Sequence, residues 1–111
     1  MSEVIHWWKP MPKYETPVIH PDTLKDAAHY RNRGNMVMAE ILHKLGATRA
    51  WLDATSLVRE RVCNQSRLMI LDGESRAAAD AYYRDEMVRL NRECDAFCAE
   101  TWAEFSGKVP A

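Results

Sequence analysis

Two pairs of potential metal ligands stand at helical spacing in this sequence. Glu40 and His43 form an E-x-x-H pair, and Cys94 and Cys98 form a C-x-x-x-C pair. Side chains three or four residues apart share one face of a helix. The four together could therefore hold zinc in a tetrahedral site. Zinc sites of high specificity carry C-x-x-C pairs, however, and cysteines on a helix seam act as small buried hydrophobic residues. We expect no cofactor and keep the four residues as metal candidates.

Polar and basic residues interrupt the apolar pattern of every predicted helix. If the chain turns at Gly46 and again at Gly73, antiparallel helices rising 1.5 Å per residue bring these interruptions to one height. The candidates for a ligand site in this layer are His29, Arg31, Arg33, Gln65, Tyr82 and Arg84. Two interpretations stay open. The layer is either a buried polar network that sets the register of the helices, or a pocket in which arginines bind phosphate and a tyrosine stacks on a base.

Enzyme motifs are missing from the sequence. It contains no G-x-G-x-x-G, no G-x-x-x-x-G-K-[ST], no H-E-x-x-H and no G-x-S-x-G. These motifs supply phosphate loops, zinc-dependent hydrolysis and serine nucleophiles. Acidic residues of the last third alternate with arginines, which is typical of a solvated, ion-paired helix face. The sequence therefore favours a protein that is not an enzyme.

Aromatic residues at the two ends of the chain are the candidates for binding a partner. Residues 1–21 hold four of the five prolines and two of the four tryptophans. Proline favours extended backbone, and tryptophan and tyrosine are frequent anchors of interfaces. Near the other end, large aromatics on a helical overhang need a cover. The candidate partner-binding residues are Trp7, Trp8, Tyr14, Trp102 and Phe105.

Three helices are needed to position these groups. The first is expected to begin at Asp22 or Thr23 and to end before Gly46, with Gly34 inside it as a kink or close approach. The second is expected over residues 48–71 and the third over residues 74–105, with a break at Asp72 and Gly73. Short connections favour antiparallel neighbours. We predict an all-α fold: residues 1–21 form an extended arm, 22–106 an antiparallel three-helix bundle, and 107–111 a tail.

Apolar residues at helical spacing predict which faces are buried. On the first helix the predicted core stripe is Leu24, Ala27, Val37, Met38, Ile41 and Leu45. On the third helix a heptad-like seam alternates by four and three residues and could also pair with a second copy of the chain. That seam comprises Tyr83, Met87, Leu90, Cys94, Phe97 and Thr101.

Composition narrows the class of protein further. The 111 residues carry a formal net charge of −1, with 47% hydrophobic and 28% charged residues, which is ordinary for one globular domain. The sequence shows no apolar run near 18 residues and no secretory signal, so we expect no membrane association. An odd count of three cysteines favours a reducing, cytoplasmic setting. Because basic residues are interleaved with acids, a nucleic-acid partner is not expected.

Three hypotheses for function follow. The first is a small interaction protein, an adaptor, inhibitor or assembly subunit, that binds a protein partner through the arm and forms a homo-oligomer through the third helix. By analogy, a compact helical body with a peptide-like arm is typical of accessory subunits and of phage-encoded effectors. The alternative is a helical binder of a nucleotide or another phosphate compound. The third is a metal-binding helical protein.

Overall fold

The computed structural model describes residues 14–107, and in this part of the chain every regular element is an α-helix. The elements are α1 (Pro21–Asn32), α2 (Met36–Ala54), α3 (Ser56–Leu71) and α4 (Arg76–Gly107). The all-α class is therefore confirmed. The expected division into three helices is not, because four helices are present in the described residues and two of the predicted boundaries fall elsewhere.

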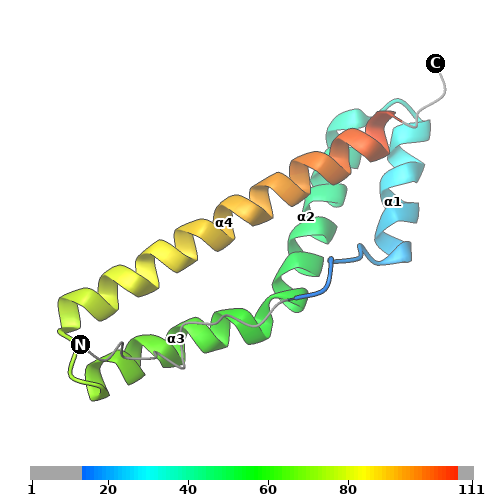
Figure 1. The fold of residues 1–111 in the computed structure, drawn as a ribbon. Coiled ribbons are helices and arrows are strands. Elements are labelled where there is room, and N and C mark those ends of the chain that lie inside the picture. Colours follow the sequence, from blue (N-terminus) through cyan, green and yellow to red (C-terminus); the bar gives the residue numbers. More distant parts are fainter. Residues whose placement is uncertain (1–13, 108–111) are drawn as a thin grey trace.

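The helices form two antiparallel hairpins, α1 with α2 and α3 with α4, which meet along α2 and α4 (Figure 1). In one hairpin α1 packs against α2, and in the other α3 packs against α4. α4 also packs against α2. Its 32 residues correspond to a length of about 48 Å. The molecule is consequently elongated, with extents of 64 × 22 × 21 Å.

The chain reverses direction at Gly34. The backbone of Gly34 has φ +81°, and its N–H donates to the carbonyl of Arg31 over 3.0 Å. Glycine reaches this left-handed conformation without the steric cost that a Cβ imposes. Asn35 then caps α2, because its Oδ1 accepts a 3.1 Å hydrogen bond from the N–H of Met38. The expected kink inside one helix is thus a complete turn between two helices.

Gly46 does not end a helix, contrary to the prediction, but lies inside α2 on the side that faces α1. A Cβ at this position would collide with Cγ2 of Thr23 and would lie 3.2 Å from Cγ2 of Ile19. Ala27, Ala39 and Ala47 are fully buried as well. Small residues on both helices allow their backbones to approach closely, and α2 therefore continues without interruption through Gly46.

Thr55 separates α2 from α3, where the sequence predicted one continuous helix. Its side chain is fully buried and donates a 2.7 Å hydrogen bond to the carbonyl of Trp51. Arg59 donates from Nη2 to the carbonyl of Leu52 over 2.6 Å. The carbonyl of Trp51 also accepts from the N–H of Thr55 over 3.0 Å, so these side-chain bonds add acceptor partners at the end of α2. α3 can thereby leave the axis of α2 and follow the first half of α4 (Figure 1).

The main core lies where α2, α3 and α4 meet. It is built from Trp51, Val58, Val62 and Leu90, with Phe97 and Tyr82 packed against it. The predicted seam of α4 faces this core through Leu90, Met87, Cys94 and Phe97. These four seam residues are therefore used within the chain, whereas Tyr83 of the same predicted seam is 39% exposed.

The described part of the N-terminal arm docks on the chain's own helices. Residues 14–20 carry no regular element, and Pro17 and Ile19 are buried. The ring of Tyr14 packs edge-on against Trp51 with centroids 5.0 Å apart. α1 begins at Pro21, just before the predicted start, and His20 caps it by accepting from the N–H of Asp22 through Nδ1. Among the helices described, none is long and apolar enough to cross a membrane.

Candidate functional site

The outer face of α2 carries an apolar stripe that is largely exposed. Ile41, Leu45 and Leu52 are 49%, 63% and 42% exposed. Together with Met38 and Thr48 they recur at alternating intervals of three and four residues, which is the spacing of a helix-pairing seam. Thr48 lies at the border of this stripe, because its hydroxyl is 3.6 Å from Sγ of Cys98 on α4. The sequence predicted Met38, Ile41 and Leu45 as core, and this prediction was wrong. The larger apolar side chains of α2 lie on its exposed face, so the hydrophobic pattern pointed to that face instead of the buried one.

The buried face of α2 is formed by a different set of residues at four-residue intervals. These residues are Ala39, His43, Ala47 and Trp51. Three of them are small or polar, so a hydrophobicity pattern gives them less weight than the leucines and isoleucine of the outer face. The signal that could have identified them is the clustering of small residues in both helices, here with buried Ala27 of α1, where two backbones approach.

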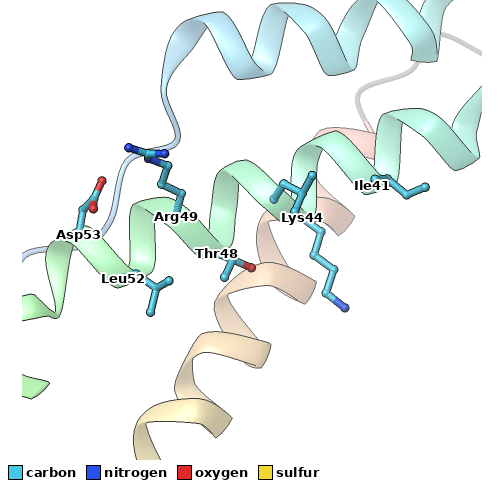
Figure 2. A pocket seen from close by; sticks show the side chains of 7 residues that line it. Ile41, Lys44, Thr48, Arg49, Leu52 and Asp53 are labelled. Atoms are coloured by element: carbon cyan, nitrogen blue, oxygen red, sulfur yellow. The ribbon is translucent and has the colours of Figure 1, made fainter.

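A shallow groove of about 530 Å³ runs along the outer face, which we call the α2 groove. All of its lining residues belong to α2: Ile41, Lys44, Leu45, Thr48, Arg49, Leu52 and Asp53. Figure 2 shows Lys44 and Arg49 pointing to opposite sides of the helix. Each cation therefore flanks the middle of the apolar stripe on one side.

A second cluster joins the end of α4 to α1 and α2. The ring of His43 lies 5.5 Å from that of Trp102 and 5.1 Å from that of Phe105, measured between centroids. The guanidinium of Arg31 lies 4.5 Å above the Phe105 ring, and its Nη1 donates a 3.1 Å hydrogen bond to the Phe105 carbonyl. This cluster therefore combines a residue predicted to bind metal (His43), one predicted to bind a ligand (Arg31) and two predicted to bind a partner (Trp102 and Phe105).

The environment of His43 favours its neutral form. It is only 1% exposed, and burial lowers the pKa of its imidazole. Its Nδ1 is buried and has no hydrogen-bond partner among the described residues. A cavity of about 260 Å³ adjoins the ring, between the segment before α1 and helices α1, α2 and α4.

The four metal candidates are not assembled into one site. His43 faces the aromatic cluster, whereas Glu40 is exposed and lines a shallow pocket together with Cys98. Burial, followed by the effect of neighbouring Cys98, raises the pKa of Cys94 to about 11. A raised pKa disfavours the thiolate that binds metals. Within residues 14–107 no group of three or more histidine, cysteine or acidic side chains is placed to hold a metal ion.

The predicted polar layer is divided between the two ends of the molecule. Tyr82 donates a hydrogen bond to Oε1 of buried Gln65, between α4 and α3. Arg31 instead contacts Phe105, which lies 23 residues after Tyr82 on the same helix, or about 35 Å away. The prediction was wrong because it placed a turn at Gly46, which shifted every height estimate for the first helix.

The remaining members of that layer lie on the surface. His29 is exposed on α1 and packs edge-on against Tyr30, with ring centroids 5.4 Å apart. Arg33 is exposed in the turn after α1, and Arg84 is exposed on α4. The structure therefore brings together Gln65 and Tyr82 but not the three arginines that were expected to bind phosphate.

The predicted partner anchors are mostly occupied within the chain. Tyr14 packs against Trp51, and Trp102 and Phe105 are half-buried around His43. The cover expected for the aromatic overhang is thus supplied by α1 and α2. Trp7 and Trp8 lie outside the described residues.

Comparisons with protein-family models, with curated proteins and with solved structures give no match for this chain. What the fold and the site define is an all-α protein of two hairpins with an exposed apolar face on α2 and an aromatic cluster around His43.

Proposed function

We propose that this protein is a non-enzymatic interaction module, an adaptor, inhibitor or assembly subunit, that binds a helix of a partner protein in the α2 groove. The observation that carries this proposal is the exposed apolar stripe of Ile41, Leu45 and Leu52. Contiguous apolar surface on a small protein marks an interaction site more often than chance exposure does. Its seam spacing is the pattern by which one helix packs against another.

Covering the stripe supplies part of the free energy that binding requires, and contacts made by the flanking residues must supply the rest. Complete burial of a leucine or isoleucine side chain contributes about 1.5–3 kcal/mol. Three such side chains are about half exposed here, so covering them contributes a few kcal/mol, with further contributions from the residues that flank them. This range suits a reversible helix-in-groove contact.

Charge favours a partner helix with acidic residues beside the middle of its own apolar stripe. Lys44 and Arg49 flank the centre of the groove on opposite sides (Figure 2). In an antiparallel pair of two α2 helices centred between Leu45 and Thr48, the two copies of Lys44 would lie on one side and only about 7.5 Å apart along the axis. The two copies of Arg49 would face each other in the same way. This repulsion disfavours a second copy as the occupant.

A designed peptide pair tests the proposal directly. One 21-residue amphipathic helix carries leucine on its seam and glutamate beside it, and the second carries lysine in place of glutamate. We expect the acidic peptide to bind at least tenfold more tightly than the basic one, measured by fluorescence anisotropy in low salt. Leu45→Glu should abolish binding. Leu71→Glu, which changes an even more exposed leucine outside the groove, should not.

The outcomes separate the possible occupants. Equal affinity for both peptides would mean that the groove binds apolar helices without regard to charge, and the proposal would fail. Absence of peptide binding together with a dimer in sedimentation, dissociated by Leu45→Glu, would make a second copy of the chain the occupant. Circular dichroism of each variant shows whether its fold is intact.

A further inference from the structure

Two free thiols stand one turn apart on α4, beside its contact with α2. Cys94 is partly exposed and Cys98 is buried, and the two thiols are in hydrogen-bonding contact with each other. Sγ of Cys98 also lies 3.6 Å from the hydroxyl oxygen of Thr48 on α2. Cys98 lines a shallow pocket of about 440 Å³, so an ion can approach the pair from solvent. Neither cysteine lines the α2 groove.

The spacing of the pair works against a disulfide. Residues four apart on a helix have Cβ atoms about 5–6 Å apart, whereas a disulfide requires a Cβ separation of about 3.5–4.5 Å. A bond between the two sulfurs would therefore distort α4. Burial raises the pKa of Cys94 to about 11, so this thiol is uncharged near neutral pH and a poor target for oxidants. The geometry therefore favours two thiols over a disulfide.

The same spacing suits an ion between the two sulfurs. A metal–thiolate bond is about 2.3 Å long, so two such bonds in line span up to about 4.6 Å between the sulfurs. An inserted ion therefore joins two sulfurs that a direct bond would have to pull together. Both ligands belong to one helix, so helix formation alone brings them to one face.

The number and type of ligands select the ion. A structural zinc site requires four ligands, and within residues 14–107 no group of three or more histidine, cysteine or acidic side chains could hold an ion. Because the raised pKa of Cys94 disfavours the thiolate, only an ion with a strong preference for sulfur displaces the proton. Cu(I) is a soft ion that thiolates select, and two sulfurs in line satisfy it.

The charge of such a complex is small. One Cu(I) between two thiolates carries a single negative charge; each thiol releases one proton as its bond to the metal forms, and no electron is transferred. Lys44 lines the same pocket as Cys98 and favours this charge, whereas Glu40 and Asp95 in that pocket oppose it. All three charged side chains are exposed and therefore screened, so the two sulfurs supply most of the affinity.

We propose that Cys94 and Cys98 form a two-coordinate binding site for Cu(I) at the contact between α2 and α4. The site goes beyond the function proposed for the α2 groove and does not depend on it, so the two proposals can fail separately.

Anaerobic titration of the full chain with Cu(I), in competition with a chromogenic Cu(I) chelator, tests this proposal. We expect one ion per chain and a thiolate-to-copper charge-transfer absorption in the ultraviolet. Cys94→Ser and Cys98→Ala should each weaken binding by at least about 100-fold, because the second sulfur no longer binds the same ion intramolecularly. Cys94 is partly exposed, so Cys94→Ser decides the outcome even if Cys98→Ala fails to fold.

Two control variants and a second ion identify the site. Cys63→Ser removes the third cysteine, on α3, and Leu45→Glu changes the α2 groove; both should bind Cu(I) as the wild-type protein does. Zn(II) should not be retained in the presence of a zinc chelator of matched strength. Unchanged affinity in Cys94→Ser, lost affinity in either control variant, tight binding of Zn(II), or no retention of Cu(I) would overturn the proposal. In the last case the two cysteines act only as small hydrophobic residues in the helix contact.

Discussion

The hydroxyl of Tyr14 donates a 2.9 Å hydrogen bond to Oε2 of Glu93, a residue 79 positions further along the chain. Burial, followed by the hydrogen bond to Glu93, raises the pKa of Tyr14 to about 12. The contact fixes the N-terminal segment to the middle of α4, beside the core around Trp51. This part of the arm is consequently a structural element of the bundle.

Loss of this hydrogen bond should lower stability. Tyr14→Phe keeps the ring contact with Trp51 and removes only the hydroxyl group. We expect the free energy of unfolding to fall by about 1 kcal/mol, measured by urea denaturation. Tyr83→Phe is the control, because Tyr83 lies largely on the surface of α4. Equal stability of Tyr14→Phe and the wild-type protein would show that the segment is not held by Glu93.

Stability should depend on pH through His43. Because burial lowers the pKa of folded His43, the unfolded chain takes up a proton below about pH 6.5 while the folded chain does not. The unfolded state then binds more protons, so the free energy of unfolding falls as the pH drops from 7 towards the folded pKa of His43. His43→Phe should flatten this part of the profile. His29→Gln should retain the wild-type slope, and a slope unchanged in His43→Phe would refute the assignment.

The close approach of α1 and α2 should make Gly46 intolerant of any side chain. Gly46→Ala places a Cβ against Thr23, and we expect a loss of about 1–3 kcal/mol in thermal or urea unfolding. Adding Thr23→Ala removes the colliding methyl group and should restore part of that loss in a double-mutant cycle. Gly107→Ala meets no neighbouring atom and should have little effect. Additive losses for Gly46→Ala and Thr23→Ala would argue against the contact.

Two leucine-to-alanine substitutions test which leucine lies in the core and which lies on the surface. Leu90 is 2% exposed and Leu45 is 63% exposed. Leu90→Ala should cost about 2–5 kcal/mol, because it leaves a cavity in the core around Trp51. Leu45→Ala should change the free energy of unfolding by less than about 1 kcal/mol, measured in the same urea series. A large loss of stability in Leu45→Ala would show instead that Leu45 is buried, as the sequence predicted.

The sequence pattern alone was enough for the all-α class, for the turn at Asp72 and Gly73, and for the inward seam of α4. These features depend on local chemistry: helix-forming composition, a break before Arg76, and apolar residues at helical spacing along α4. The aromatic anchors Tyr14, Trp102 and Phe105 were also found, although the structure places them against their own chain.

The breaks within the other helices could not be assigned from local preference. Glycine is compatible both with a left-handed turn and with a close helix contact, and Gly34 and Gly46 take opposite roles from those predicted. Helix propensity does not distinguish a turn glycine from a contact glycine. The difference is whether another segment packs against the glycine, as α1 does near Thr23 against Gly46.

The sequence by itself determined that this chain is helical, that its long last helix has an inward seam, and that its ends carry aromatic anchors. Only the tertiary structure decided which face of α2 is buried and which residues meet around His43. The physical reason is that helix formation follows from hydrogen bonds and side chains a few residues apart. Burial depends instead on contacts between segments distant in sequence, such as His43 with Phe105 and Tyr14 with Glu93.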